Sequence, residues 1–191
     1  MRIIAGEFRG RKLLPPEGDV TRPITDRVKQ SLFDILAPVI EGALVYDLFA
    51  GTGSMGLESL SRGAAHVTFF ESDPPALARL RRNIEALSVG ARSTVVSGDL
   101  FHWFADARPG ERVQVAFLDP PYRFLRERPD ELRRLASKLA ADHLATDAVV
   151  VFRHDARDEL ALPPLVRRDH REYGGMVLEF LSAVERPSAT E

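Results

Sequence analysis

The 191-residue chain contains no cysteine. Disulfide bridges and thiolate zinc sites are therefore excluded, and an intracellular, cytoplasmic setting is favoured. Long apolar runs are missing too, since the longest, such as residues 148–152, are far too short to cross a bilayer. The N-terminal MRIIAG includes no long apolar region, so we expect no signal peptide. With 45% apolar residues, the chain is expected to form one globular domain with a small appendage and no membrane partner.

A strong excess of either charge is also absent, because 26 Lys and Arg residues stand against 28 Asp and Glu residues. The distribution is uneven, however. Residues 1–30 hold seven basic and four acidic side chains, a net +3, which leaves −5 for the rest of a chain with net charge −2. A basic end on a mildly acidic body is typical of a protein that meets a polyanion with one face. Charge alone is equally compatible with an ordinary solvated terminus.

What the chain does have is a regular alternation of strand and helix patterns. The predicted strands cover residues 43–49, 66–71, 93–97, 113–118 and 148–153. The predicted helices between them cover residues 54–62, 74–87, 100–104 and 129–141. This order predicts an α/β fold with a mostly parallel sheet and helices on both faces. Two further strands, 165–173 and 176–184, are split by Gly174-Gly175, which predicts a C-terminal antiparallel hairpin.

The N-terminal part does not follow this alternation of strands and helices. Apolar stretches at residues 2–5 and 11–14 surround glycines and predict a small β-hairpin, and Thr25 is a suitable N-cap for a helix. We expect three parts, which are a basic hairpin extension at 1–22, the main domain at 23–186 and a disordered tail at 187–191. The five histidines show no metal-ligand spacing, so no metal site is expected.

A glycine loop, Gly51-x-Gly53-x-x-Gly56, stands between a predicted strand and a predicted helix. Such glycines let the chain turn tightly and let a ligand approach the backbone. Glu71 ends the next strand and is placed to bind ribose hydroxyls. Asp47, just before the loop, would repel a pyrophosphate and attract a cation, which favours S-adenosylmethionine over a dinucleotide. Asp47 could instead serve only as a cap for the loop amides.

Asp99 follows the third predicted strand in the stretch SGDL. It is placed to accept a hydrogen bond from an adenine amino group, with Leu100 against the ring. An N-cap role at the short helix that follows is the alternative, and the two roles are compatible.

The stretch FLDPPY ends the fourth predicted strand with an acid, two prolines and a tyrosine. Pro120 and Pro121 fix the backbone and remove two donors, so the Asp119 carboxylate and the backbone carbonyls remain as acceptors. Acceptors beside the flat ring of Tyr122 suit an exocyclic amino group on an extruded nucleobase. As a methyl group transfers, positive charge grows on that nitrogen, and the carboxylate stabilises it. A simple Pro-Pro turn capped by Asp119 is the alternative.

These residues resemble the S-adenosylmethionine-dependent methyltransferases of nucleobase amino groups, whose signature is Asn/Asp/Ser-Pro-Pro-aromatic. The stretches RIIAGEFRGRKL, RPITDRVKQSLFDIL, DLFAGTGSMGLESLSRGA and DPPY are similar to the RsmD-type family. The resemblance implies a Rossmann-like class I methyltransferase fold. It also implies methyl transfer to the N2 amino group of a guanine in bacterial 16S ribosomal RNA, free or in an assembling 30S particle. We expect the protein to be a monomer.

Site residues follow from the motifs and the resemblance together. The expected catalytic residues are Asp119, Pro120, Pro121 and Tyr122. The expected cofactor-binding residues are Thr25, Asp47, Gly51, Gly53, Ser54, Gly56, Glu71, Ser72, Asp99 and Leu100. The expected RNA-binding residues are Arg9, Arg11, Lys12, Arg22, Arg27 and Arg123. The resemblance further suggests that the Thr25-Asp26-Arg27 segment folds over the cofactor.

Several alternatives stay open. Arg123, Arg126 and Arg128 either grip phosphates or form a mobile charged loop, and Phe101, Trp103 and Phe104 are expected in the core rather than in a base platform. The family usually has threonine at Ile24 and aspartate at Gly175, which leaves the detail of the N-terminal lid and the last hairpin open. The rival functions are an adenine-N6 methyltransferase, an NAD-dependent oxidoreductase and a catalytically silent RNA-binding module.

Overall fold

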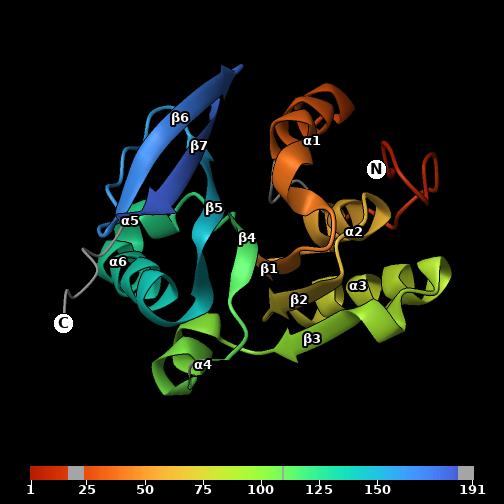
Figure 1. Ribbon diagram of the computed structural model, residues 1–191, viewed down its shortest axis with the longest axis horizontal. Coiled ribbons are helices and arrows are strands. Elements are labelled where there is room, and N and C mark those ends of the chain that lie inside the picture. Colours follow the sequence, from red (N-terminus) through yellow and green to blue (C-terminus); the bar gives the residue numbers. More distant parts are fainter. Residues whose placement is uncertain (17–23, 109, 185–191) are drawn as a thin grey trace.

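The computed structural model describes residues 1–16, 24–108 and 110–184. In this part of the chain, seven strands form one sheet in the order β3-β2-β1-β4-β5-β7-β6 (Figure 1). The strands are β1 Leu44–Leu48, β2 His66–Glu71, β3 Ser93–Ser97, β4 Val113–Leu118, β5 Leu144–Asp155, β6 Leu165–Tyr173 and β7 Met176–Ala183. The helices are α1 Asp26–Ile40, α2 Ser54–Ser61, α3 Pro74–Leu87, α4 Leu100–Asp106, α5 Phe124–Glu127 and α6 Pro129–Lys138.

The first five strands are parallel, and β7 pairs antiparallel with both β5 and β6. The predicted α/β fold, with a mostly parallel sheet and a C-terminal antiparallel hairpin, is confirmed. The chain builds the sheet outward from β1 through β2 to β3, then returns to β4 on the other side of β1. Ligands of open α/β sheets bind outside the carboxyl ends of the strands at such a reversal. The β1–β4 junction is therefore where a site is expected.

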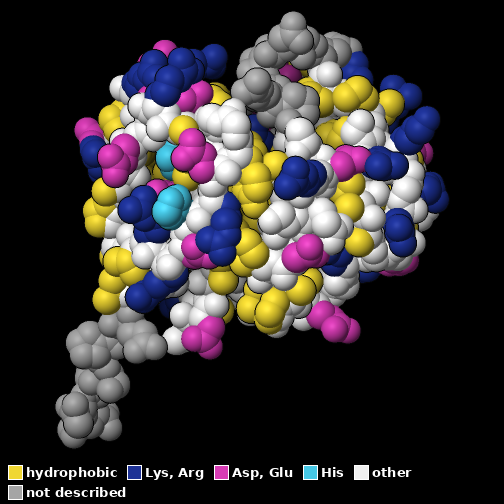
Figure 2. All heavy atoms as spheres, turned by 90° about the horizontal axis from the view of Figure 1, so that it is seen from above, with side chains coloured by type: hydrophobic (Ala, Val, Ile, Leu, Met, Phe, Trp, Pro, Cys, Tyr) yellow, Lys and Arg dark blue, Asp and Glu magenta, His cyan; other side chains and the backbone are white. Residues whose placement is uncertain are grey.

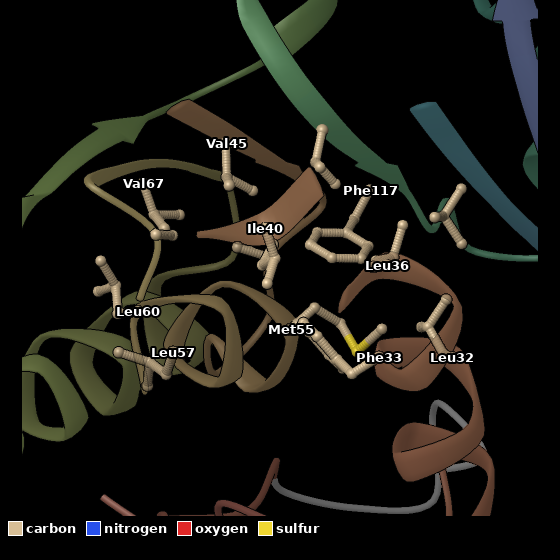
Figure 3. Packing of buried hydrophobic residues seen from close by; sticks show 14 of the residues in the cluster. Leu32, Phe33, Leu36, Ile40, Val45, Met55, Leu57, Leu60, Val67 and Phe117 are labelled. Carbon is tan, nitrogen blue, oxygen red and sulfur yellow. The ribbon is translucent and has the colours of Figure 1, made fainter. Parts of the chain in front are cut away.

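The sheet buries both of its faces. Alternate side chains of β4 point in opposite directions, so Phe117 joins the cluster under α1, α2 and α3, whereas Leu118 joins the cluster under α4, α5 and α6. Figure 3 shows Phe33 and Leu36 of α1 lying against Phe117, and the two phenylalanine rings are 5.7 Å apart. Figure 1 shows the two sets of helices on opposite sides of the sheet.

Local sequence features explain where the helices begin. The Thr25 hydroxyl accepts a hydrogen bond from the Val28 amide at 3.4 Å, which confirms the predicted N-cap of α1. Helix α2 begins in the glycine loop and packs directly on β2. A Cβ atom on Gly56 would lie 2.3 Å from the Phe69 ring, so this close approach requires glycine.

The predicted N-terminal hairpin is reduced to a single antiparallel bridge between Arg2 and Lys12. The Ile3, Gly10 and Leu13 amides bond across this hairpin, and other amides of the segment reach helix α2. The Ile4 and Ala5 amides donate to the Glu58 carboxylate at 2.8 and 3.1 Å, and the Phe8 amide donates to the Ser61 hydroxyl at 2.9 Å. The segment is thus fixed to the helix that follows the glycine loop.

Other expectations need correction at the level of elements. The helix expected at 129–141 ends at Lys138 and continues as a π-type turn, Leu139–His143, while β5 begins at residue 144 rather than 148. The segment after DPPY is the short helix α5, not a mobile loop. The expected boundary at residue 22, the residue Arg22 and the tail 187–191 lie outside the described residues. None of the helices in the described ranges is both long and apolar enough to span a membrane.

Candidate active site

A cavity of about 790 Å³ opens at the carboxyl ends of the parallel strands. Each of the five parallel strands, or the residues just after it, contributes a charged side chain to its wall. These side chains are Asp47, Glu71, Asp99, Asp119 and Arg153, from β1 to β5 in chain order. The cavity lies at the β1–β4 junction, as the topology predicts.

Asp47 is almost fully buried at the end of β1, with 2% of its surface exposed. One carboxylate oxygen accepts a hydrogen bond from the Gly56 amide at 2.8 Å, so the capping role is present. The side chain also lines the cavity. Burial raises the pKa of Asp47 to about 8, and the nearby carboxylates of Asp119 and Glu71 act in the same direction. A cation in the cavity would stabilise the ionised form.

Glu71 is held by three backbone amides at the end of β2. Its carboxylate accepts hydrogen bonds from Gly51 at 2.6 Å and from Ser72 and Asp73 at 2.8 Å each. These bonds fix the acid against the first turn of the glycine loop and leave it on the cavity wall. The carboxylate is therefore preorganised to accept further hydrogen bonds from a ligand.

Asp99 caps helix α4, because its carboxylate accepts a hydrogen bond from the Phe101 amide at 2.8 Å. The other carboxylate oxygen lies 3.5 Å from the Arg128 guanidinium. Asp99 and Leu100 both line the cavity. The N-cap alternative for Asp99 is therefore present, and the predicted contact with adenine remains a prediction.

Asp119 follows β4 and forms an ion pair that was not predicted. The Arg153 guanidinium of β5 donates to its carboxylate at 3.0 Å. The Arg153 side chain is only 9% exposed, and that of Asp119 is 27% exposed. Burial raises the pKa of Asp119, while the positive charge of Arg153 opposes this rise. An arginine inside the apolar run AVVVFR was the signal that could have identified this residue.

The backbone after Asp119 is set by the start of α5. The Pro121 carbonyl accepts from the Phe124 amide at 2.8 Å, and the Tyr122 carbonyl accepts from the Leu125 amide at 3.2 Å. Pro121 lines the cavity, whereas Pro120 is buried and Tyr122 is half-buried, with its ring 6.0 Å from the Arg153 guanidinium carbon. The structure thus brings Asp119 and Pro121 to the cavity wall and holds Pro120 and Tyr122 behind it.

Three phenylalanine rings form another part of the wall. The rings of Phe49, Phe101 and Phe124 lie 5.9 to 6.3 Å apart, and all three line the cavity. The Arg128 guanidinium lies 4.4 Å from the centre of the Phe101 ring and 4.9 Å from that of Phe124. Phe101 and Trp103 are half-buried and pack against the core cluster under α4, α5 and α6, and Phe104 is fully buried, so the expectation that these rings belong to the core is confirmed. Phe101 lines the cavity as well. Arg128 is held by rings and carboxylates rather than presented to phosphates.

Only some of the remaining predicted cofactor-binding residues line the cavity. Gly51, Ser54 and Ser72 line the cavity, whereas Thr25, Gly53 and Gly56 shape the adjoining elements. Met1 and Ile24 also line it, so the N-terminal segments reach the cavity. Met1, Phe49, Phe124 and Arg153 line the cavity without having been predicted to do so.

The predicted RNA-binding residues that the structure describes, which leaves out Arg22, lie in the N-terminal segment, in α1 and just before α5. Arg9, Lys12 and Arg27 are exposed, and Arg123 lines the cavity on the side of α5. Arg11 is exposed as well, but its guanidinium donates to the Ala86 carbonyl at 2.6 Å. Figure 2 shows Lys and Arg side chains recurring along the edge where Figure 1 places the N-terminal segment and α3.

The charges on the cavity wall are unevenly placed. Asp47 and Glu71 stand on the glycine-loop side, whereas Asp99 and Asp119 pair with Arg128 and Arg153. A cationic ligand is therefore attracted to the glycine-loop side. Among the described residues, no group of three or more His, Asp or Glu side chains is arranged to hold a metal ion.

Comparison with known proteins identifies the family of this chain. The family described as Conserved hypothetical protein 95 matches residues 1–182. The chain belongs to this RsmD-type family. Ribosomal RNA small subunit methyltransferase D of Escherichia coli K12 is 43% identical over 123 residues, which cover 64% of this chain and 61% of that relative. "Putative rRNA methyltransferase YlbH" of Bacillus subtilis is 35% identical over 164 residues, 84% of this chain and 85% of that protein.

Solved structures show the same fold. "Putative methyltransferase yhhF" from Escherichia coli superimposes with a TM-score of 0.82 at 33% identity, covering 96% of this chain and 97% of the other. The RsmD-type chain therefore has the class I methyltransferase fold that its resemblance to the family implied.

Proposed function

We propose that this RsmD-type protein transfers a methyl group from S-adenosylmethionine to the N2 amino group of a guanine in bacterial 16S ribosomal RNA. The observation that carries the proposal is the position of Asp119. Its carboxylate stands beside the acidic glycine-loop side of the cavity, at the end of the strand next to Asp47. A methyl donor bound on that side and an amino group at Asp119 would be close enough to react. The names of the relatives support ribosomal RNA, free or in an assembling 30S particle, as substrate.

The residues on the glycine-loop side fit S-adenosylmethionine. This cofactor supplies an electrophilic methyl group on a positively charged sulfur. Asp47 would attract its positive charge, Glu71 would accept hydrogen bonds from ribose hydroxyls, and Asp99 would accept from the adenine amino group. A pyrophosphate would instead meet the Asp47 and Glu71 carboxylates, which argues against a dinucleotide. The aromatic wall around Phe101 adds an apolar surface for a flat ring.

On the other side, this chain would orient the substrate amino group. Asp119 and the Pro120 carbonyl would accept the two N–H groups, so that the nitrogen lone pair points toward the methyl donor. The carboxylate would stabilise the positive charge that develops on nitrogen as the N–C bond forms and the methyl–sulfur bond breaks, which leaves S-adenosylhomocysteine. The methylated nitrogen would then lose one proton to solvent. Tyr122 is proposed to stack on the extruded base after a local rearrangement, since its ring is half-buried next to Arg153.

Single-turnover methyl transfer to small-subunit RNA and particles, with saturating cofactor, tests this proposal. We expect Asp119→Ala to keep its affinity for S-adenosylhomocysteine and to lose ~10²–10³-fold in rate, because the carboxylate acts on charge present only in the transition state. Asp119→Asn should be milder, since an amide oxygen still accepts. Asp130→Ala, which removes an exposed carboxylate on α6, is the matched control. A near wild-type rate for Asp119→Ala would place the chemistry elsewhere.

A further inference from the structure

Arg153 occupies a position where a charged side chain is unusual. It lies on β5, between β4 and β7 in the sheet, and follows the buried residues Val150, Val151 and Phe152. The β4–β5 register pairs Leu118 with Phe152, so Arg153 stands beside Asp119. Buried arginines occur in proteins when a partner compensates for their loss of hydration. The compensating partner here belongs to the proposed catalytic motif.

The guanidinium contacts the motif at two points. One terminal nitrogen donates to an Asp119 carboxylate oxygen at 3.0 Å, and the guanidinium carbon lies 6.0 Å from the centre of the Tyr122 ring. Both acidic and aromatic members of DPPY are thus held by a single side chain from the neighbouring strand. Arg153 itself also lines the cavity.

We propose that Arg153 is a positioning residue for methyl transfer, which fixes one Asp119 oxygen so that the other faces the substrate amino group. This inference rests on the proposed function. A carboxylate accepts through two oxygens, and a guanidinium bond to one of them sets the plane of the group. The same bond favours the ionised form, which is the form that accepts both from Arg153 and from an amine.

The charges around Asp119 make this role necessary. Asp47 faces it from β1, Tyr122 follows it on the same loop, and Arg153 faces it from β5. Burial works against a negative charge on Asp119, and the positive charge of Arg153 opposes this effect. Without Arg153, Asp119 would hold its proton to higher pH and would donate a hydrogen bond where the amine needs an acceptor.

The first test measures the single-turnover rate of Arg153→Met between pH 5.5 and 9. We expect a loss of ~10²-fold near neutral pH, because the carboxylate loses both the partner that orients it and the positive charge that favours its ionised form, with partial recovery as the pH rises. Arg153→Lys should restore part of the rate. It should also move the low-pH part of the pH–rate profile back toward that of the wild type. In the Asp119→Asn background, replacing Arg153 should no longer change the pH profile. Arg157→Met, which removes an exposed arginine on the same side of the fold, is the control.

The second test needs no turnover and compares urea unfolding of the ligand-free protein at pH 5 and pH 9. The pKa of Asp119 is raised in the folded state, so stability falls as pH rises above the unfolded pKa. Arg153→Met should make the loss of stability between pH 5 and pH 9 larger. When Asp119→Asn is added, this extra loss should disappear. Asp47 is present in all of these proteins, so its own titration contributes equally to each.

The outcomes separate the two claims. If the wild-type protein transfers no methyl group to small-subunit RNA, the proposed function fails. If the wild type is active but Arg153→Met lowers the rate equally at every pH, or equally with Asn at position 119, the positioning role is wrong. A pH-dependent loss that disappears in the Asp119→Asn background supports it.

Discussion

Asp47 illustrates a conflict between stability and binding at the scale of one residue. The carboxylate is buried next to two other acids, and this environment raises its pKa to about 8. In the ligand-free protein, an ionised Asp47 is therefore unfavourable at neutral pH. A bound cation reverses the preference, so we expect binding to be coupled to the release of a proton.

Asp47→Asn tests this coupling through stability. Between the unfolded pKa of ~3.9 and about pH 8, the folded wild-type protein binds more protons than the unfolded chain, so its free energy of unfolding falls as pH rises. The free energy of unfolding of the variant should change much less with pH. At pH 8 the variant should be more stable than the wild type by on the order of 1–3 kcal/mol. Urea unfolding measures the difference, with the exposed Asp106→Asn as control.

The same variant should bind S-adenosylhomocysteine more weakly. Calorimetry at pH 7 in buffers of different ionisation enthalpy should show release of about one proton per ligand from the wild type and almost none from Asp47→Asn. Equal proton release by both proteins would mean that Asp47 is not the group that meets the cation.

At the scale of elements, the N-terminal segment and α2 meet at one buried carboxylate. Glu58 is fully buried and accepts hydrogen bonds from the Ile4 and Ala5 amides. It also pairs with Lys29 of α1 at 3.3 Å and with Arg62 at 2.9 Å. Lys29 in turn lies 3.4 Å from the Ser54 hydroxyl at the glycine loop. This anchor joins three parts of the chain next to the cofactor side of the cavity.

Glu58→Gln should therefore be strongly destabilising. It removes the negative charge that compensates two cations, and breaking such a buried pair typically costs about 3–5 kcal/mol. Chemical unfolding gives the value, and Glu85→Gln on the exposed face of α3 should change it little. If Glu58→Gln proved as stable as this control, the N-terminal segment would be held by its apolar contacts and its hydrogen bonds to Ser61 rather than by the Glu58 charge.

The elements also show what the sequence could predict. The bounds of β2, β3, β4, β6 and α3 were predicted to the residue, because glycine, proline and turn residues flank strongly apolar or periodic runs. The short helix α5 was missed, since one turn carries no period to recognise. The N-terminal hairpin was overestimated because several of its backbone donors bind Glu58 and Ser61, which no local pattern reveals.

The candidate site likewise has one part that the sequence predicted and one part that it did not. Acids at strand ends could be predicted to meet, because parallel strands bring their carboxyl ends to one edge of the sheet. The Arg153–Asp119 pair and the packing of Phe49, Phe101 and Phe124 depend on how β5, α4 and α5 lie against each other. Such contacts follow from tertiary packing, so a single sequence does not specify them.

At the scale of the whole molecule, the uneven charge predicts which side meets RNA. Replacing Arg9, Arg11 and Lys12 by alanine should weaken RNA binding and flatten its salt dependence by about 0.7–0.9 in log–log slope for each phosphate that the variant no longer neutralises. The affinity for S-adenosylhomocysteine should not change. Arg11 should contribute least, since its guanidinium already binds the Ala86 carbonyl.

A matched control removes the same charge from the opposite side of the sheet, by replacing Arg108, Arg133 and Lys138 with alanine. Arg133 and Lys138 belong to α6, and Arg108 follows α4. If both triple variants changed the slope equally, binding would reflect total charge rather than a docking face.

The central claim, transfer of a methyl group to a guanine amino group from an active site at Asp119, is tested most directly by nucleoside mass spectrometry. Unmodified small-subunit RNA and particles are incubated with S-adenosylmethionine carrying a labelled methyl group and either the wild-type protein or Asp119→Ala, then digested to nucleosides. We predict labelled N2-methylguanosine with the wild type and little of it with the variant. Labelled N6-methyladenosine, no labelled nucleoside with the wild type, or equal N2-methylguanosine with both proteins would contradict the account.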